Sequence, residues 1–290
     1  MKHFIKSLMM YTMVCTVTAT ASHAQTFVED SLKVQGHMRQ FVMYLPAGLK
    51  ADAPVIFVLH GHGGSIWRGN PFIKTADKHG FAVCIPQGLK EPTGKTAWNV
   101  GYPFQEGWKV DDVKSLCRMA RYVQKKYQLS RENTFLTGMS NGGEMCYLMA
   151  YSKQQTFKAV APIAGLTMEW TYRTMEAPRP IPLMEIHGTE DRVSEWFGDL
   201  GNKGGWGAYM PVPQAVGYWV ARNRCTHEET ERVESLRGSQ GNPIIRHCFT
   251  GSPTGCDVWL YEVQGAGHVW FVEDIDTGEE IWRFFQQYVK

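Results

Sequence analysis

A Gly-x-Ser-x-Gly pentapeptide at residues 138–142 surrounds Ser140 with the residue types that a nucleophilic serine requires. An ordinary serine hydroxyl reacts poorly at neutral pH, so catalysis needs an exposed position, a base and donors for an oxyanion. Glycines on both sides relieve crowding at a strained turn between a strand and a helix, which places the hydroxyl above the sheet. We therefore predict that Ser140 is the nucleophile of such a turn.

A candidate acid and a candidate base follow Ser140 in the chain order serine, acid, histidine. Asp191 comes in a turn just after the predicted strand at residues 181–186. His268 ends a glycine-rich loop that follows the predicted strand at residues 257–263. We predict that His268 takes the proton from Ser140 and that Asp191 holds the imidazole in the required tautomer.

Neighbouring polar residues offer alternatives to this choice of acid. Glu190 adjoins Asp191, but the two side chains should point in different directions, so only one of them can serve. Asp274 and Asp276 are better suited to starting the last helix. His187 is expected to support the turn of the acid rather than to act in catalysis.

The sequence His-Gly-His-Gly-Gly at residues 60–64 follows a continuous apolar run and predicts an oxyanion loop. Glycines there let backbone N–H groups approach a developing negative charge. The expected donors are the N–H groups of His62 and Asn141. A metal pair formed by His60 and His62 is the alternative, but no acid or cysteine completes a ligand set nearby. We therefore expect neither a metal nor an organic cofactor.

Strands and helices alternate along most of the chain, which predicts an α/β fold with a mostly parallel, doubly wound sheet and helices on both faces. An antiparallel pair of strands is expected first, at residues 27–34 and 38–45. Further strands are predicted at residues 55–59, 81–85, 134–137, 157–162, 181–186 and 257–263, and helices at residues 71–79, 111–127, 144–151, 213–222 and 273–288. In such sheets, sites form at the carboxyl ends of the strands, where every candidate residue falls.

The first 24 residues have the features of an export signal. Two lysines precede an apolar stretch at residues 8–17, and the small residues Ser22 and Ala24 fit a signal peptidase site, which predicts cleavage after Ala24. A lipoprotein signal through Cys15 is the alternative, but the residues before it are not small. The apolar stretch is short for a bilayer span, and we expect residues 25–290 to be a single exported domain.

Loss of residues 1–24 would leave 28 basic and 28 acidic residues. This neutral balance argues against nucleic acid or a membrane surface as a partner of the mature form. The chain also has ten tryptophans, twelve tyrosines and fourteen phenylalanines, more than a core of this size requires. Most should pack in the core, and some are expected to line a cleft for a sugar or an aryl group.

Six cysteines lie within residues 25–290, and an even number permits disulfides in an exported protein. Three occupy apolar positions and are expected to be buried thiols: Cys84, Cys117 and Cys146. The other three lie in polar, glycine-rich surroundings. Among these we predict a bridge from Cys225 to Cys256, with Cys248 as the competing partner.

These motifs resemble those of the secreted α/β-hydrolases that include feruloyl esterases, acetyl xylan esterases and single-domain poly(3-hydroxybutyrate) depolymerases. The resemblance covers most of residues 25–290 and is carried by Leu59-His60-Gly61, Trp98-Asn99, Asp111-Asp112-Val113, residues 138–143, residues 157–161, Ala164-Gly165, His187-Gly188-Thr189, Asp191, Trp219, Asn223, Cys225 and Gly267-His268-Val269-Trp270.

The resemblance implies Ser140, Asp191 and His268 as the catalytic triad, in agreement with the order of these residues in the chain. It also implies a disulfide from Cys225 to a cysteine just before the last strand, for which Cys256 is the nearer match. Trp98, Asn99 and Trp270 resemble residues of the family that lie beside the site, and we expect them to contact substrate. Packing would explain either tryptophan equally well.

The chain departs from the family pattern in three places. Phe271 follows Trp270 where the family usually has proline, and Cys248 has no obvious counterpart. A glycine-rich segment, residues 196–210, looks longer than its family counterpart and should reshape the cleft. Its aromatic residues are Trp196, Phe197, Trp206 and Tyr209. These departures leave the chemistry unchanged and bear on the choice of substrate.

The resemblance and the triad together predict an exported serine esterase that removes feruloyl or acetyl groups from plant cell-wall polysaccharide such as xylan. A depolymerase of hydroxybutyrate polyesters is the first alternative, although such enzymes usually add a binding domain and a linker. A serine peptidase is the second, because a triad alone does not separate esters from amides. An inactive carbohydrate-binding protein of the same fold would normally lack a member of the triad.

Overall fold

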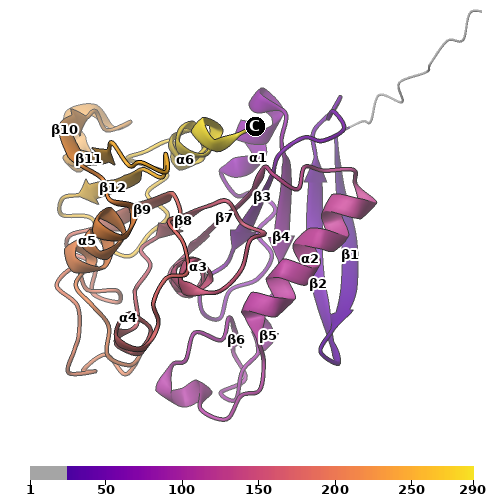
Figure 1. Cartoon of the computed structure of the whole chain (residues 1–290), viewed down its shortest axis with the longest axis horizontal. Helices are drawn as coiled ribbons and strands as arrows, with labels where there is room; N and C mark the ends of the chain where they lie inside the picture. Colours follow the sequence, from indigo (N-terminus) through magenta and orange to yellow (C-terminus); the bar gives the residue numbers. More distant parts are fainter. Residues whose placement is uncertain (1–24) are drawn as a thin grey trace, which may run out of the picture.

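Ten strands form one sheet in the computed structural model of the chain, which describes residues 25–290 (Figure 1). In order across the sheet they are β1 (Thr26–Val34), β2 (His37–Leu45), β4 (Ala82–Pro86), β3 (Val55–Leu59), β7 (Thr134–Met139), β8 (Ala159–Ile163), β9 (Leu183–Gly188), β12 (Val258–Val263), β11 (Ile244–Thr250) and β10 (His227–Val233). A separate two-stranded sheet is formed by β5 (Leu89–Lys90) and β6 (Thr96–Ala97). The predicted export signal and its cleavage site after Ala24 lie outside the described residues.

The six strands from β4 to β12 in this order run parallel, and antiparallel strands extend both sides of the sheet. This confirms the predicted α/β architecture with its mostly parallel sheet. Strand β3 shows why the apolar run is continuous, because Phe57 and Leu59 belong to one buried cluster while Ile56 and Val58 belong to the other. Both faces of a central parallel strand are covered, so every side chain of the strand is apolar.

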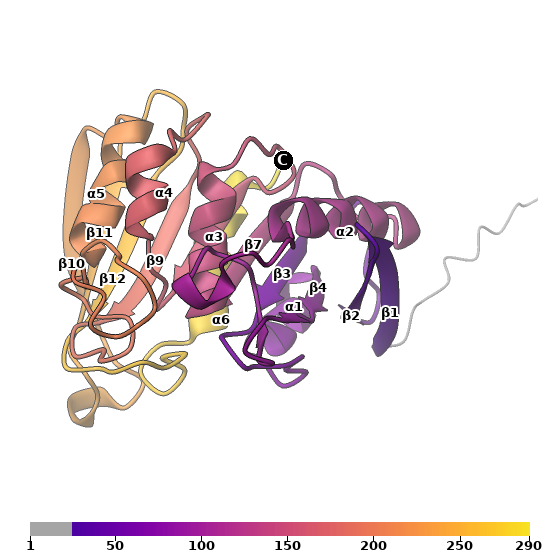
Figure 2. The ribbon, with the colours of Figure 1, turned by 90° about the horizontal axis from the view of Figure 1, so that it is seen from below.

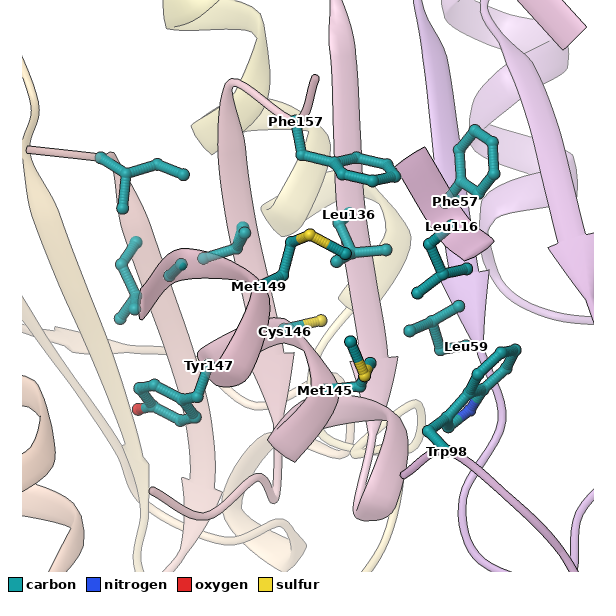
Figure 3. Packing of buried hydrophobic residues seen from close by; sticks show 14 of the residues in the cluster. Phe57, Leu59, Trp98, Leu116, Leu136, Met145, Cys146, Tyr147, Met149 and Phe157 are labelled. Atoms are coloured by element: carbon teal, nitrogen blue, oxygen red, sulfur yellow. The ribbon is translucent and has the colours of Figure 1, made fainter. Parts of the chain in front are cut away.

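Helices cover both faces of the sheet (Figure 2). One face carries α2 (Asp112–Lys126), α3 (Asn141–Tyr151), α4 (Glu169–Thr174) and α5 (Val212–Asn223), and the other carries α1 (Phe72–His79) and α6 (Thr277–Phe285). Figure 3 shows the core between α3 and the strands, where Met145, Cys146 and Met149 lie in one buried cluster with Phe57 and Leu136. Burial of each large side chain of this kind stabilises the fold by about 1.5–3 kcal/mol.

Helix α2 illustrates how the sequence sets an element. The Asp111 carboxylate accepts a hydrogen bond from the Lys114 N–H at 2.8 Å, which caps the first turn of the helix. The apolar side chains that recur at helical spacing are buried, namely Leu116, Met119, Ala120 and Val123. The predicted buried thiols Cys84, Cys117 and Cys146 are also buried.

Several elements differ from the sequence prediction. Helix α3 begins at Asn141, directly after the nucleophile, rather than at residue 144. Helix α6 begins at Thr277, where Asp276 accepts from the Glu279 N–H, whereas Asp274 accepts from Ser235, Arg237 and Asn242 in a loop. The β10–β11 hairpin was not predicted, because β10 is almost wholly exposed and its charged sequence lacks an apolar face.

The predicted bridge between Cys225 and Cys256 is not formed, since both residues and Cys248 are free thiols. The chain brings Cys225 and Cys256 close together, but their side chains meet backbone acceptors instead. Cys225 Sγ lies 3.7 Å from the Cys256 carbonyl oxygen, and Cys256 Sγ lies 3.7 Å from the Thr254 carbonyl oxygen. Cys248 lies on β11, opposite Trp259 of β12.

Within residues 25–290, no helix combines the length and the apolar character needed to cross a membrane.

Candidate active site

Ser140 lies in the sharp turn between β7 and α3. Its backbone has φ +56° and ψ −124°, a conformation that residues with a side chain rarely adopt. The Ser140 N–H donates to the Ile163 carbonyl at 2.9 Å, and the Ser140 carbonyl accepts from the Glu144 N–H at 2.8 Å. The strand on one side and the helix on the other therefore hold the strained residue, as expected for an exposed nucleophile.

The glycines of the pentapeptide are required by close backbone contacts. A Cβ at Gly138 would lie 2.7 Å from Leu59 Cβ, and a Cβ at Gly142 would lie 2.6 Å from the Leu59 carbonyl oxygen. Real Cβ atoms do not approach other atoms so closely. The end of β3 thus packs directly against the turn that carries Ser140.

His268 and Asp191 meet at the carboxyl ends of β12 and β9. These strands are parallel neighbours, with Val263 opposite Gly188, so the loops that follow them lie side by side. His268 Nδ1 lies 2.7 Å from Asp191 Oδ2. The shared hydrogen bond leaves Nε2 as the ring nitrogen available to a serine hydroxyl.

The order of the parallel strands brings all three predicted triad residues to one edge of the sheet. Ser140 follows β7, Asp191 follows β9 and His268 follows β12, and these strands are separated only by β8 and by one another. Within residues 25–290, no direct hydrogen bond joins the Ser140 hydroxyl to His268. Such bonds commonly form only when substrate binds.

Asp191 is fixed by further hydrogen bonds. Its Oδ1 accepts from the N–H groups of Val193 and Ser194, both at 2.8 Å. Burial raises the pKa of Asp191, but the hydrogen bond and charge of His268 and the two backbone N–H groups outweigh that effect, and the pKa lies below its ordinary value. The acid is therefore ionised at neutral pH.

A buried carboxylate–histidine pair lies behind Asp191. His187 Nδ1 lies 2.8 Å from Glu185 Oε1, and its Nε2 lies 2.8 Å from the Ser194 carbonyl oxygen and 3.7 Å from Asp191 Oδ2. Burial lowers the pKa of His187, but Glu185, the Ser194 carbonyl and Asp191 together raise it above its ordinary value. His187 thus supports the turn of the acid. Sequence reasoning missed Glu185, although an acid two residues before a histidine in a buried strand was a usable signal.

The oxyanion loop is held by the His60 side chain. Its Nε2 accepts from the Gly88 N–H at 2.9 Å, and its Nδ1 lies 2.7 Å from the Gly61 carbonyl oxygen. Burial lowers the pKa of His60, which favours a neutral ring that donates through Nδ1. His62 Nε2 lies 2.7 Å from Glu91 Oε1. Both rings therefore have protein partners, and residues 25–290 hold no cluster of three or more His, Cys, Asp and Glu suited to a metal ion.

Both predicted oxyanion donors lie beside the nucleophile. A Cβ on Gly61 would lie 3.3 Å from Ser140 Cβ, so the loop that carries His62 passes next to the serine. The His62 N–H has no acceptor among residues 25–290. Asn141 occupies the first turn of α3, where backbone N–H groups lack a partner within the helix. These two groups are free to donate to a bound substrate.

Trp98 is fully buried, so it does not contact substrate as predicted. Its Nε1 donates to the His60 carbonyl at 3.0 Å, and its N–H donates to Asn141 Oδ1 at 2.7 Å. Asn141 Nδ2 donates back to the Trp98 carbonyl at 3.1 Å. Figure 3 shows Trp98 in the core with Leu59 at the end of β3. Its role is to join the oxyanion loop to the nucleophile turn.

The Asn99 amide nitrogen is also occupied within the protein, and the predicted contact of this half-buried residue with substrate stays a prediction. Its Nδ2 donates to the carbonyl groups of Trp108 and Val110, both at 2.9 Å. The Asn99 N–H donates to the Asp112 carboxylate, which forms a fully buried ion pair at 2.6 Å with Arg39. The Arg39 guanidinium lies over the Trp98 ring, 5.7 Å from its centroid. Nothing in the sequence around Arg39 indicated this buried pair.

Trp270 lines a cavity of about 210 Å³ beside the oxyanion loop. Its ring contacts Trp67 edge to face, with the centroids 5.3 Å apart. The cavity is lined by Val58, Leu59, His60, Gly61, Gly64, Ser65, Trp67, Ile85 and Trp270. Gly61 borders both this cavity and Ser140, and the contact of Trp270 with substrate stays a prediction.

Comparison with solved structures identifies the architecture. An acetyl xylan esterase from Aspergillus awamori superposes with a TM-score of 0.61 at 15% sequence identity, over 86% of this chain and 94% of that one. The chain has the α/β-hydrolase fold. Residues 73–192 of the chain also match the prolyl oligopeptidase family.

Sequence relatives of the chain are mostly esterases by name. A bifunctional acetylxylan esterase/xylanase from Neocallimastix patriciarum is 25% identical over 268 residues, 90% of this chain and 35% of the relative. Feruloyl esterase B from Piromyces equi is 26% identical over 259 residues, 86% and 45% of the two chains. Poly(3-hydroxyalkanoate) depolymerase C from Paucimonas lemoignei is 22% identical over 271 residues, which cover 88% of this chain and 64% of the relative. The chain spans less than two thirds of the length of each of these relatives.

Proposed function

We propose that this α/β-hydrolase is an exported serine esterase that forms an acyl-enzyme intermediate on Ser140. The observation that carries the proposal is the hydrogen bond of 2.7 Å between His268 and Asp191, at the same sheet edge as the strained Ser140 turn. A strained serine, an oriented histidine and two unpartnered N–H groups are the parts that acyl transfer requires.

The proposed reaction uses only side chains and backbone groups of the chain. Ser140 Oγ attacks the ester carbonyl carbon while His268 Nε2 takes the hydroxyl proton, and Asp191 stabilises the resulting imidazolium. The N–H groups of His62 and Asn141 donate to the oxyanion of the tetrahedral intermediate. The bond to the alcohol then breaks, and His268 returns the proton to the departing oxygen. Water then attacks the carbonyl carbon of the acyl group on Ser140 while His268 takes its proton. The bond to Ser140 Oγ breaks, His268 returns the proton to Oγ, and the acid is released.

We further propose that the acyl group is acetyl or feruloyl and that the alcohol belongs to a polysaccharide of the xylan type. The names of the relatives support this substrate class, and two indole rings beside the oxyanion loop suit a flat acyl group. Hydroxybutyrate polyesters are the second candidate, supported by the depolymerase relative.

Release of acetate, ferulate and 3-hydroxybutyrate from matched ester substrates tests this proposal, with Ser140→Ala as the blank. We expect hydrolysis of at least one xylan-type ester and a loss of at least about 1,000-fold in Ser140→Ala. Preferred release of 3-hydroxybutyrate would favour the polyester alternative. Turnover that survives in Ser140→Ala would contradict the assignment of the nucleophile.

A serine peptidase activity is a further candidate because of the prolyl oligopeptidase match at residues 73–192. Aminoacyl anilides and aryl esters of the same acyl group separate the two activities. We expect esters to be turned over and anilides to be resistant. Comparable rates on both would favour the peptidase.

We also propose that the chain is exported with cleavage after Ala24. The intact mass of the protein recovered outside the cytoplasm should then correspond to a chain that starts at Gln25. A lipid-modified N-terminus at Cys15 would support the lipoprotein alternative instead.

A further inference from the structure

Three aromatic rings surround the side chain of His62, whose backbone N–H is a proposed oxyanion donor. The ring centroids of Trp206, Phe104 and Tyr102 lie 5.2, 5.7 and 6.3 Å from that of His62. Trp206 also lies 5.8 Å from Phe104 and 5.4 Å from Tyr102. The cluster therefore lies immediately beside the site, on residues that no triad step uses.

The cluster has a buried floor and an open rim. Tyr102 is 2% exposed, and its hydroxyl donates to the Glu144 carboxylate. Phe104 and Trp206 are only half-buried, and the His62 side chain is 19% exposed. Large aromatic side chains that remain accessible next to a reactive group offer a surface to a ligand.

The segment of residues 196–210 holds Trp206 in place through its own hydrogen bonds. Asp199 Oδ2 accepts from the Gly204 N–H at 2.8 Å, and Asn202 Oδ1 accepts from the Gly207 N–H at 2.7 Å. Gly207 has φ +96°, and a Cβ there would lie 3.2 Å from Pro103 Cδ. The backbone of this segment thus packs against Pro103, the residue before Phe104. The rings of Trp206 and Phe104 together form a fixed aromatic surface, the shelf.

The shelf and the Trp270 cavity differ in the part of an ester that each can hold. The cavity of about 210 Å³ contacts Gly61 and suits a small or flat acyl group. The shelf contacts the next residue of the loop, His62, and its rim is open. A sugar within a polysaccharide continues as chain on either side of the esterified position, so it requires an open surface.

We propose that Trp206 and Phe104 form the stacking surface for the sugar ring of the leaving alcohol, and that Trp206 determines preference for carbohydrate esters. The proposal rests on the esterase function proposed above. Aromatic faces bind the apolar C–H face of a sugar while its hydroxyl groups remain in water, which is the arrangement an open rim permits. The longer segment of residues 196–210 would then explain how this chain selects its alcohol.

The test compares two esters of one acyl group in wild type, Trp206→Ala, Trp206→Phe and Phe197→Ala. One substrate is the feruloylated or acetylated xylo-oligosaccharide, and the other is the corresponding methyl or aryl ester. In Trp206→Ala we expect kcat/KM to fall about tenfold on the oligosaccharide ester, mainly through KM, and to stay within about twofold on the simple ester. Trp206→Phe should recover most of the loss. Phe197, 81% exposed in the same segment, is the matched control and should change neither rate.

Each outcome decides the proposal. Unchanged turnover of the simple ester shows that Trp206→Ala is folded with its triad intact. An equal loss of kcat/KM on both esters would mean that Trp206 only supports His62. No loss of kcat/KM on either ester would mean that the shelf binds no sugar. Both results would overturn this proposal without contradicting the proposed esterase function. Wild type that hydrolyses neither ester would instead refute the proposed function itself.

Discussion

Asp191 accepts three hydrogen bonds, which serve two purposes in catalysis. The bond to His268 Nδ1 directs Nε2 toward the substrate side, while those from Val193 and Ser194 fix the carboxylate in its turn. The lowered pKa of Asp191 keeps the group ionised through the neutral range. The choice of this residue over Glu190 follows from burial, because Asp191 is 4% exposed whereas Glu190 lies on the surface.

Replacement of Asp191 by asparagine should lower kcat by about 10,000-fold on any ester substrate, because the amide no longer selects the tautomer of His268 that accepts the serine proton. Circular dichroism should show a folded protein. Glu190→Gln is the matched control and should retain wild-type kcat. A large loss of kcat in Glu190→Gln, with activity retained in Asp191→Asn, would show that Glu190 and not Asp191 is the acid of the triad.

Chain order predicted the three triad positions, because each lies just after a strand whose apolar run is visible in the sequence. The contacts of Trp98 and Asn99 could not be predicted in this way. Whether a tryptophan faces a cleft or the core depends on the path of loops that carry no periodic pattern, and here Trp98 turns inward to bind the His60 carbonyl. Arg39 was missed because its partner Asp112 is distant in sequence, whereas Glu185 was missed although its partner His187 lies only two residues later in the same strand.

At the scale of elements, the site depends on how β3, β7 and α3 approach one another. The Leu59 carbonyl would lie 2.6 Å from a Cβ on Gly142, so the strand end and the first helical turn are in direct backbone contact. The pentapeptide glycines therefore serve packing between elements as well as the strained φ at Ser140. The same contact places the loop after β3 beside the nucleophile.

Gly142→Ala should lower the free energy of unfolding by about 1–3 kcal/mol, because the added methyl group forces β3 and α3 apart. Ester hydrolysis should fall with it, since both oxyanion donors adjoin this contact. Gly217→Ala in α5 is the matched control: its Cβ meets nothing within 4 Å, and alanine should raise stability by about 0.5–1 kcal/mol. Denaturant melts of the two variants check this, and equal effects at both glycines would argue against the close contact.

Across the whole molecule, the two faces of the sheet enclose separate cores, and several ionisable groups are buried with them. Glu144 in the first turn of α3 is 4% exposed, and burial raises its pKa to about 8, against the lowering effect of the Tyr102 hydroxyl. The sequence predicted the helix and its apolar face but not this buried acid. The β10–β11 hairpin at the far side of the sheet also escaped prediction, because β11 obtains order from pairing with β12, and β10 from pairing with β11, rather than from an apolar pattern of their own.

Stability should fall as pH rises because of Glu144. Its pKa is raised from 4.5 in the unfolded chain to about 8 in the folded protein, so between these pH values the folded state binds more protons than the unfolded state. The free energy of unfolding therefore decreases as pH rises through this range. Glu144→Gln keeps the neutral form at every pH. The Tm of this variant relative to wild type should therefore rise from pH 5 to pH 9. A Tm difference that stays constant over this range would show that Glu144 does not titrate as described.

The assignment of Ser140 as the nucleophile is tested most directly by covalent labelling with a fluorophosphonate probe, which reacts with an activated serine hydroxyl. Intact mass should show one adduct per chain, and peptide mapping should place it on Ser140. Ser140→Ala should remain unlabelled, and wild type preincubated with an ester substrate should label more slowly. An adduct on another residue, or full ester hydrolysis by an unlabelled Ser140→Ala protein, would contradict the catalytic site described above.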